Sequence, residues 1–224
     1  VGQSFVLPTF SQMYSREQAG GISNIIGNPD LKPQKGLHYE AGWKKEETNR
    51  QYKVALFTEK IDDNISYSAT SGRWYTINED FKNHGIEASI RGQEDNGFTW
   101  HAGLTWQDPK SKQTTEKTSA KRYWDRSYGR ILLTGGVGYE KEKWTTALNF
   151  SYLADRVQSP LAAHSHSVKP YLLTSMTVKY SPNKSSDIML AIDNLLNRKD
   201  IVSHTTSDYY ATPRNFILSY RYKF

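Results

Sequence analysis

Hydrophobic and polar residues alternate one by one along four stretches of the chain. These stretches cover residues 36–44, 98–107, 144–152 and 216–224. In the second of them the apolar positions are Phe98, Trp100, Ala102, Leu104 and Trp106, and every position between them is Thr, His, Gly or Gln. A period of two predicts β-strands with one apolar face and one polar face.

Weaker alternation predicts further strands, which brings the total to about ten. They lie near residues 52–67, 73–91, 129–140, 170–181 and 186–194, and a first strand is expected in the opening residues. The connections then alternate in length, with short polar turns near 45–50, 92–97, 140–143 and 181–186, and long loops over about 9–34, 108–128, 156–169 and 197–212. Short turns on one rim and long loops on the other are typical of an outer-membrane β-barrel, with the turns periplasmic and the loops outside.

The apolar faces of the clearest strands carry no charged residue. A Lys or Arg on a lipid-facing strand costs about 2 to 4 kcal/mol at mid-membrane, so this pattern favours lipid contact. Aromatic residues beside the short turns or the chain end predict an interfacial girdle: Trp43, Tyr52, Phe98, Tyr139, Trp144, Tyr180, Tyr222 and Phe224. The alternative is that these rings form the core of a soluble β protein.

The composition narrows the class of protein. The 224 residues contain no Cys and have a mean hydropathy of −0.72, and no stretch approaches the roughly 18 consecutive apolar residues of a spanning helix. Helical membrane proteins and disulfide scaffolds are therefore excluded. The chain begins at Val1 with no export signal, so we expect a fragment whose signal lies upstream. The net charge of +6 is compatible with binding of nucleic acid, of an anionic membrane surface or of an anionic ligand. The positions of the charged residues in the chain decide among these.

Five short motifs, in order, resemble the TonB-dependent receptor family over the whole chain. Residues 5–9 are similar to its Phe-Arg-Ala-Pro segment, with Val6 in place of the basic residue. Residues 27–33 with 39–42 are similar to its Asn-Pro-x-Leu-x-Pro-Glu box and the following Tyr-Glu-x-Gly, with Gln34 where Glu is commoner. Residues 83–87, 193–197 and 213–224 resemble its Gly-Ile-Glu strand entry, its Asn-Leu-Phe-Asn element and its closing strand.

The resemblance implies an all-β, antiparallel transmembrane barrel, of which this chain is the C-terminal portion. Family members close about 22 strands around a plug, so residues 1–224 would supply about ten, with no plug domain. The implied function is import of a ferric siderophore or similar nutrient with TonB energy coupling, with no cofactor and no enzymatic activity. The implied partners are the missing strands and plug, the TonB complex, and outer-membrane lipid and lipopolysaccharide.

Several residues have expected roles within such a barrel. The polar wall is expected to face a hydrated lumen or the plug through Glu40, Lys44, Lys53, Glu59, Glu87, Arg91, Lys179 and Arg221. Asn28 is expected to start a turn with Pro29, and Asn194 and Asn197 to satisfy backbone groups at a strand end. The terminal Phe224 resembles the signal read by the outer-membrane assembly machinery, and it also suits a girdle.

Cations interleaved with aromatic rings mark the candidate ligand-capture loops, because cations attract an anionic complex while ring faces pack on catechols. The clearest group includes Lys110, Lys112, Lys117 and Arg130 beside Tyr128. The residues predicted to bind ligand are Arg73, Trp74, Tyr75, Lys121, Arg122, Tyr123, Trp124, Arg126, Tyr209 and Tyr210. For any single residue, a basic outer surface against lipopolysaccharide is the competing interpretation.

Two histidines in one loop, His164 and His166, suggest a haem or metal site. Haem receptors of the resembled family usually carry a His between the first two motifs, and residues 9–27 contain none. A ferric siderophore is therefore preferred as the ligand, and cobalamin or another bulky nutrient is the second choice.

The alternative from another class is a self-contained ten-stranded outer-membrane protease similar to the omptins. Its candidate catalytic residues would be Asp108, Asp125, Asp155, His164 and Asp208. Their spacing does not demand catalysis. A nucleic-acid module is disfavoured because the basic residues sit in loops at one rim without a recognised binding motif.

Overall fold

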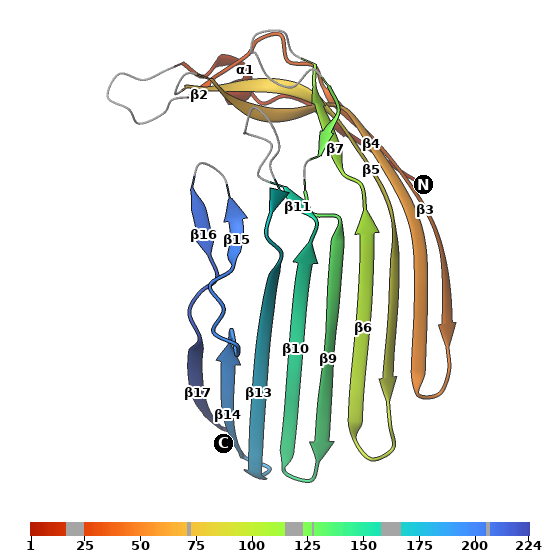
Figure 1. Ribbon diagram of the computed structural model, residues 1–224, viewed down its shortest axis with the longest axis vertical. Helices are drawn as coiled ribbons and strands as arrows, with labels where there is room; N and C mark the ends of the chain where they lie inside the picture. The colour runs from red at the N-terminus through yellow and green to blue at the C-terminus, as the bar shows by residue number, and fades with distance from the viewer. Residues whose placement is uncertain (17–24, 71–72, 115–122, 127, 158–166, 205–206) are drawn as a thin grey trace.

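Ten strands follow one another in chain order across a single antiparallel sheet (Figure 1). The computed structural model describes residues 1–16, 25–70, 73–114, 123–126, 128–157, 167–204 and 207–224. The ten strands are β1 (Gly2–Val6), β3 (Gln34–Glu46), β4 (Arg50–Thr70), β5 (Arg73–Gln93), β6 (Phe98–Gln107), β9 (Ile131–Lys141), β10 (Trp144–Ala154), β13 (Tyr171–Asn183), β14 (Ser186–Asp193) and β17 (Asn215–Tyr222). Both the predicted number of strands and their alternation of short and long connections are confirmed.

The pairing register separates the two faces of this sheet. Residues directly opposite each other in an antiparallel pair project to the same face, so one row can be followed from strand to strand. Leu56 of β4, Ile86 of β5 and Trp106 of β6 lie in such a row. Along the main strands this apolar face carries charges only near its two ends, which confirms the predicted separation of apolar and polar faces.

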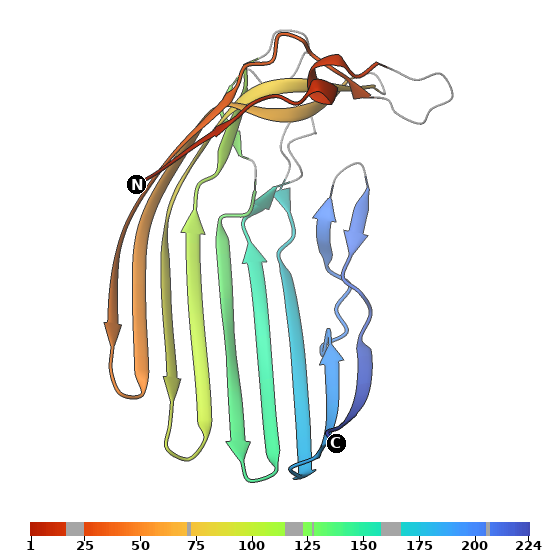
Figure 2. The same cartoon turned by 180° about the vertical axis from the view of Figure 1, so that it is seen from behind.

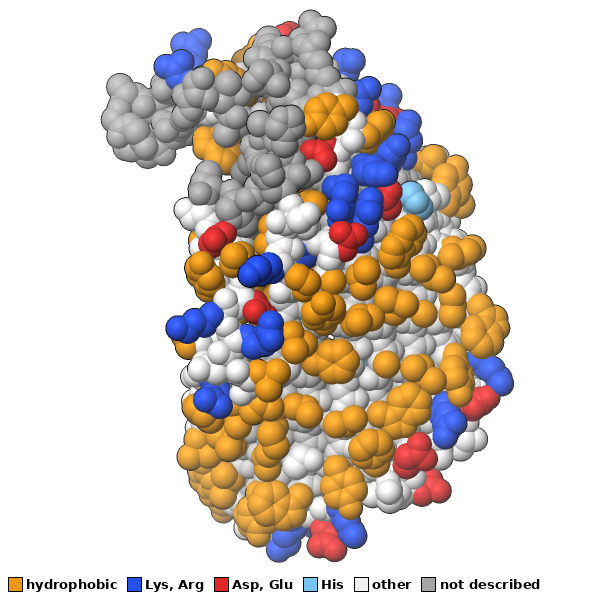
Figure 3. All heavy atoms as spheres, in the orientation of Figure 1, with side chains coloured by type: hydrophobic (Ala, Val, Ile, Leu, Met, Phe, Trp, Pro, Cys, Tyr) orange, Lys and Arg blue, Asp and Glu red, His pale blue; other side chains and the backbone are white. Residues whose placement is uncertain are grey.

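The apolar face is visible in the space-filling view, where hydrophobic side chains cover most of the sheet (Figure 3). Charged side chains gather above and below this band. Large side chains on the face are well exposed, among them Leu218 at 75% and Tyr220 at 66%. Few hydrophobic side chains in the described part are buried, among them Leu31 and Ile77, which fits a wall surrounded by lipid and not a soluble core.

The predicted girdle aromatics lie close to the short turns. Trp144 pairs with Tyr180 across β10 and β13, with ring centroids 4.5 Å apart. Tyr222 and Phe224 are in edge-to-face contact at 5.1 Å. The turn after β5 closes through Gly97, whose φ of +88° is a conformation that glycine adopts without strain.

The sheet is curved and does not close on itself (Figures 1 and 2). Among the described strands β1 pairs only with β3, and β17 pairs only with β14. Two unpaired edges cannot face lipid, because each free N–H and C=O there lacks a partner. No helix in the described ranges is long and apolar enough to cross a membrane.

The long connections contain more regular structure than the sequence predicted. The additional elements are α1 (Phe10–Tyr14), β2 (Ile25–Ile26), β7 (Lys110–Gln113), β8 (Asp125–Arg126), β11 (Arg156–Val157), β12 (Ser167–Val168), β15 (Ile201–His204) and β16 (Asp208–Tyr210). The prediction of plain loops over these segments was wrong in this respect. All of these elements lie at the end of the sheet opposite the short turns, which we call the outer end (Figure 1).

Candidate ligand-capture end of the barrel wall

The outer end is built on two unusually long strands. β4 and β5 have 21 residues each, about 70 Å if fully extended, whereas a membrane-spanning strand needs only about 9 to 11 residues. The excess bends across the top of the sheet together with β2 and α1 (Figures 1 and 2). We call this part the cap. It begins at a bulge in β4, between Ile61 and Asn64, where Asp63 has a φ of +54°.

Asn78 of β5 holds the cap together from its centre. This buried side chain accepts a hydrogen bond from the Lys32 N–H at 2.8 Å and donates to the carbonyl oxygens of Lys32 and Asp63 at 3.1 and 2.7 Å. The N–H and the hydroxyl of Thr114 both reach the Asn78 carbonyl at 3.1 Å. One residue therefore joins the segment before β3, the bulge of β4 and the end of β7.

The turn expected at Asn28 also supports the cap. The Asn28 side chain accepts a hydrogen bond from the Asp30 N–H at 3.1 Å, and its carbonyl accepts one from the Leu31 N–H at 3.2 Å. The preceding helix is capped by Thr9 in a reciprocal capping box with Gln12. The predicted turn is confirmed, and it directs the chain from α1 and β2 into β3.

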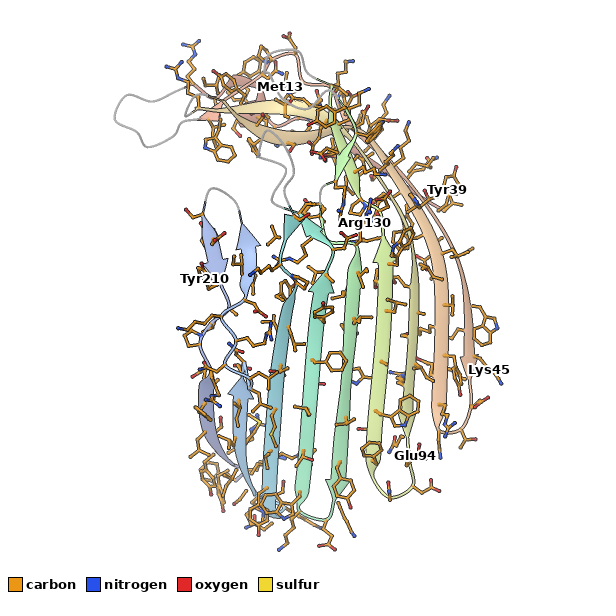
Figure 4. The ribbon with its side chains drawn as sticks, viewed as in Figure 1. Met13, Tyr39, Lys45, Glu94, Arg130 and Tyr210 are labelled. Carbon is orange, nitrogen blue, oxygen red and sulfur yellow. The ribbon has the colours of Figure 1, made fainter. Side chains whose placement is uncertain are left out.

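A group of ion pairs lies where β6, β7 and β9 meet. The Asp108 carboxylate is 10% exposed and contacts Lys110 at 2.6 Å and Arg130 at 2.5 Å. Burial by itself raises the pKa of Asp108, but the hydrogen bonds and positive charges of Lys110 and Arg130 outweigh burial and hold the pKa below its usual value. Arg126 and Arg130 also reach Asp155, at 2.7 and 3.6 Å. Figure 4 shows Arg130 beneath the cap, at the top of the sheet.

A set of hydrogen bonds at the outer end is centred on Arg156, which is buried. Its guanidinium donates to the carbonyl oxygens of Lys169, Ile201 and Val202 at 2.9, 2.5 and 3.0 Å, and it lies over the Tyr171 ring at 4.6 Å. Burial lowers the pKa of Arg156. The sequence analysis did not single out this residue. Its only sequence feature is its position directly after a regular strand, which does not reveal which distant carbonyls it will meet.

Asn194 and Asn197 act as expected where the chain leaves β14. Asn194 donates to the carbonyl oxygens of Arg198 and Thr212, both at 2.8 Å, and accepts from the Arg198 N–H at 3.0 Å. Asn197 accepts from the Arg214 N–H at 3.1 Å. Both residues have positive φ, 48° and 51°, a region that Asn tolerates better than most residues.

The residues predicted to bind ligand lie in three separate places at the outer end. Arg73, Trp74 and Tyr75 form the start of β5, inside the strand expected near residues 73–91 and not on the loop to which they were also assigned, and β2 pairs with Trp74 and Tyr75. Tyr209 and Tyr210 were also expected on a loop and lie instead on β16, where both are exposed. In Figure 4 Tyr210 lies on the β15–β16 hairpin, away from the cap.

The third place is the connection between β7 and β9. Tyr123 and Trp124 are exposed there, and the Lys82 ammonium lies 4.1 Å from the centre of the Trp124 ring. Arg126 forms part of β8 and is paired with Asp155. Lys117, Lys121, Arg122, His164 and His166 fall outside the described residues. Within the described ranges no group of three potential metal-ligating side chains occurs.

The polar face of the sheet carries all eight predicted wall residues. In the register, Lys44 lies opposite Lys53, His38 opposite Glu59, and Gln51 opposite Arg91, all on the face away from the apolar band. The same holds for Thr145 with Lys179 and for Asp187 with Arg221. Glu40, Lys53 and Glu87 line one shallow hollow of this wall together with Ser89 and Thr134. A water-filled or plugged interior is the environment that suits such a face.

Comparison with known proteins identifies relatives of the chain. Residues 1–195 match the family described as "TonB dependent receptor-like, beta-barrel". The vitamin B12 transporter BtuB of Vibrio vulnificus is 24% identical over 92% of this chain and 32% of its own length. The ferric-pyoverdine BN7/BN8 receptor of Pseudomonas putida is 23% identical over 88% of this chain and 24% of its own length. Among solved structures, the copper transporter OprC superimposes with a TM-score of 0.74 at 15% identity, over 99% of this chain and 36% of that protein.

The chain thus spans about a third or less of the length of these relatives. All three are named as transporters or receptors, and none as an enzyme. The protease alternative gains no support. Two of its candidate carboxylates, Asp108 and Asp155, are engaged by Arg and Lys side chains at the outer end. His164, the only histidine among its candidates, lies outside the described residues.

Proposed function

Because the chain belongs to the TonB-dependent receptor β-barrel family, we propose that it forms the C-terminal part of the wall of an importer for a ferric siderophore. Barrels of this family reside in the bacterial outer membrane, so the apolar face contacts lipid there. The observation that carries the proposal is the asymmetry of the sheet. One end closes with tight turns, and the other extends into a cap and hairpin that bear cations and exposed rings.

The remainder of the barrel, a plug and the TonB complex are the proposed partners. Two unpaired strand edges support the first of these, since further strands would satisfy the free backbone groups of β1 and β17. The charged inner face supports the second, because Glu40, Lys53 and Glu87 offer both signs of charge to a plug surface. Energy coupling would act on the plug and not on this chain. Residues 1–224 therefore contribute the wall and the outer capture surface.

A ferric siderophore is the proposed ligand class because rings and cations occur together at the outer end. Tyr209, Tyr210 and Tyr123 are exposed, and Arg73 lies at the cap. Exposed rings can stack on the flat groups of a chelator, and cations attract the net negative charge that many ferric chelates carry. The relatives are named for vitamin B12, ferric pyoverdine and copper, so the ligand has to be tested.

Uptake by intact cells tests the proposal. The receptor chain that contains these residues would be expressed in a bacterial strain without its own siderophore receptors, and uptake of iron-labelled siderophores would be compared with uptake of labelled cobalamin. We expect siderophore iron uptake that disappears when the TonB system is deleted. Uptake of cobalamin alone would overturn the siderophore assignment, and uptake of neither, with a normal amount of receptor at the surface, would overturn import.

Paired variants would locate the capture surface. Replacing Tyr209 and Tyr210 with Ala should weaken siderophore binding, because two exposed rings are lost while the hairpin backbone remains. Tyr139→Ala is the control, since Tyr139 is also an exposed tyrosine but lies beside a short turn at the opposite end of the sheet. Equal binding by both variants would exclude the hairpin from the capture surface.

A further inference from the structure

Arg156 joins two small sheets that stand on the outer end of the wall. One consists of β11 and β12, and the other is the β15–β16 hairpin. The guanidinium donates through Nη1 to the carbonyl oxygens of Lys169 and Ile201, and through Nη2 to that of Val202. Figures 1 and 2 show the hairpin beside the outer ends of β11 and β13. One side chain thus connects segments that lie 13 and 45 positions further along the chain.

The contacts to Ile201 and Val202 fall on an irregular point of β15. Ile201 pairs with Tyr210 of β16, and the next pair is Ser203 with Tyr209. Val202 is therefore an extra residue without a partner in β16, which makes this point a β-bulge. Successive carbonyl groups of a regular strand point toward opposite neighbours, but at this bulge two successive carbonyls reach one guanidinium. Arg156 holds the bulge from outside the hairpin.

The bulge lies directly across from the two tyrosines of the proposed capture surface. Tyr209 and Tyr210 are exposed, and as neighbours in one strand they project to opposite faces of the hairpin. A slip of one residue in the pairing would exchange these faces. Because an isolated two-stranded hairpin is at best marginally stable in water, its register needs support from the rest of the protein.

Contacts at the base of the hairpin fix where it leaves the wall. The Asp200 carboxylate accepts a hydrogen bond from the Leu172 N–H at 2.9 Å, and the Asp200 carbonyl accepts one from the Ala211 N–H at 2.8 Å. Both contacts come before the bulge. Arg156 acts at the bulge itself, and it is a firm support because a buried charge needs its hydrogen bonds and its guanidinium also packs on the Tyr171 ring.

We propose that Arg156 is a positioning residue for ligand capture. By holding the bulge of β15, it fixes the register of the hairpin and the directions in which Tyr209 and Tyr210 project. Arg156 is itself buried and acts through these rings without touching the ligand. The planar guanidinium suits this role, because its two NH₂ groups can bind neighbouring carbonyls at the same time. The capture role rests on the proposed function of the hairpin in siderophore binding.

A distance measurement without ligand tests the positioning role. Ser167→Cys in β12 and Ser203→Cys in β15 would carry spin labels in the intact receptor, since both positions are exposed and residues 1–224 contain no Cys. Ser203 lies opposite Tyr209 and shares its face. We expect one narrow distance distribution in the parent receptor. Arg156→Met keeps the bulk of the side chain but removes the N–H donors, and it should broaden the distribution and add a second population.

Two results of this measurement would overturn the proposal. The first is an unchanged narrow distribution in Arg156→Met, whether or not the receptor binds a siderophore. The second is loss of the heat-modifiable barrel in this variant, because Arg156 would then support the whole wall. We expect the barrel to persist, since Arg156 lies beyond the end of β10 at Ala154.

Binding measurements test whether the direction of the rings matters. The probe is the tightest binder among a ferric catecholate, a ferric hydroxamate and ferric pyoverdine. Arg156→Met should raise its Kd about tenfold, as expected if the hairpin is in the competent register about a tenth of the time. In the Tyr209→Ala, Tyr210→Ala background the same change should have an effect of less than about twofold, because residues that act through one another are not additive.

Arg50→Met is the control, since it removes an exposed arginine at the short-turn end, and it should leave the Kd unchanged. A tenfold loss in both tyrosine backgrounds, or an equal loss in the control, would overturn positioning through the tyrosines. Failure of the proposed function gives a different result: the parent receptor binds none of the three probes, while the labels still report the change in the hairpin. Full affinity in Arg156→Met, with a parent receptor that binds, would sink this proposal alone.

Discussion

The side-chain amide of Asn194 donates a hydrogen bond of 2.8 Å to the carbonyl oxygen of Thr212, 18 positions further along the chain. The contact closes the base of the β15–β16 hairpin, because Asn194 directly follows β14 and Thr212 shortly precedes β17. The same amide donates to Arg198. One buried side chain thus fixes where the outer hairpin leaves the membrane wall and where it returns.

Replacement of Asn194 by Ala should destabilise this hairpin. Loss of the amide leaves the Arg198 and Thr212 carbonyl oxygens without their partner, at a cost of about 1 to 3 kcal/mol. Asn194→Gly is the matched variant, since Gly adopts the φ of +48° freely but also lacks the amide. Proteolysis of the hairpin in the folded receptor measures the effect. Both variants should be cleaved faster, and resistance of the Gly variant would show that backbone conformation matters and the hydrogen bonds do not.

Asp108→Asn should weaken the outer end at neutral pH. The variant leaves Lys110 without a charged partner and Arg130 with only its longer contact to Asp155 at 3.6 Å, which we expect to cost about 1 to 3 kcal/mol after allowance for the exposure of the two cations. Thermal unfolding of the receptor at pH 7 measures the loss. The variant Glu47→Gln, which removes an exposed carboxylate paired with Lys45 at the turn end, should leave the unfolding temperature nearly unchanged.

The same pair of proteins gives a pH dependence with a definite sign. The folded pKa of Asp108 is lowered relative to an unfolded value of about 3.9. The stabilisation from the ionised carboxylate is therefore complete above that value, and it is lost as the pH falls through the folded pKa. The stability difference between the native chain and Asp108→Asn should be constant from about pH 5 to 8 and shrink below about pH 4. A difference that shrinks between pH 6 and 7 would contradict this assignment.

Gly97→Ala should impair folding of the β5–β6 turn. A Cβ atom at this position would lie 1.9 Å from the Glu140 carbonyl oxygen, and the φ of +88° is unfavourable for Ala. Strain of this kind costs about 1 to 3 kcal/mol. The yield of heat-modifiable folded receptor should fall. Gly2→Ala serves as the comparison because its nearest contact would be an ordinary 3.9 Å, and equal yields from the two variants would argue against a required glycine in the turn.

The sequence predicted the membrane-spanning part of the fold well and the outer end poorly. Alternation such as that from Trp144 to Ala154 arises because each residue meets either lipid or the polar interior, so the environment is encoded locally. Above the membrane both faces of a strand meet water or other protein, and this constraint disappears. The short strands at Lys110–Gln113 and Asp208–Tyr210 were therefore not predicted, whereas the strands expected near 52–67 and 73–91 cover most of β4 and β5.

Contacts between distant residues were the least predictable part of the candidate site. Asn194 was expected to satisfy backbone groups because Asn at a strand end has that local chemistry. Nothing local indicates that Arg156 will reach the carbonyls of Ile201 and Val202. These relationships follow from strand order and register, which the alternation pattern does not specify across long connections.

A charge placed on the apolar face should be far more harmful than one on the polar face. Leu148→Lys puts an ammonium against mid-membrane lipid, at a cost of about 2 to 4 kcal/mol. Asn149→Lys, the next residue on the same strand, directs the charge to the polar interior beside Gly136 and Ser175. The amount of folded receptor in outer-membrane fractions should fall for the first variant and not for the second. Similar amounts of the two variants would show that the faces are not distinguished by lipid.

Spin labels along β10 provide the most direct test of the lipid-facing assignment. The described sequence has no Cys, so single Cys residues introduced at successive positions from Thr145 to Leu153 can each carry one label in the receptor reconstituted in bilayers. Collision with oxygen, which concentrates in lipid, should be high at positions 146, 148, 150 and 152 and low at the positions between them, with the opposite pattern for a water-soluble nickel chelate. A uniform profile, or labels at the even positions shielded from both reagents by a second protein layer, would contradict the account.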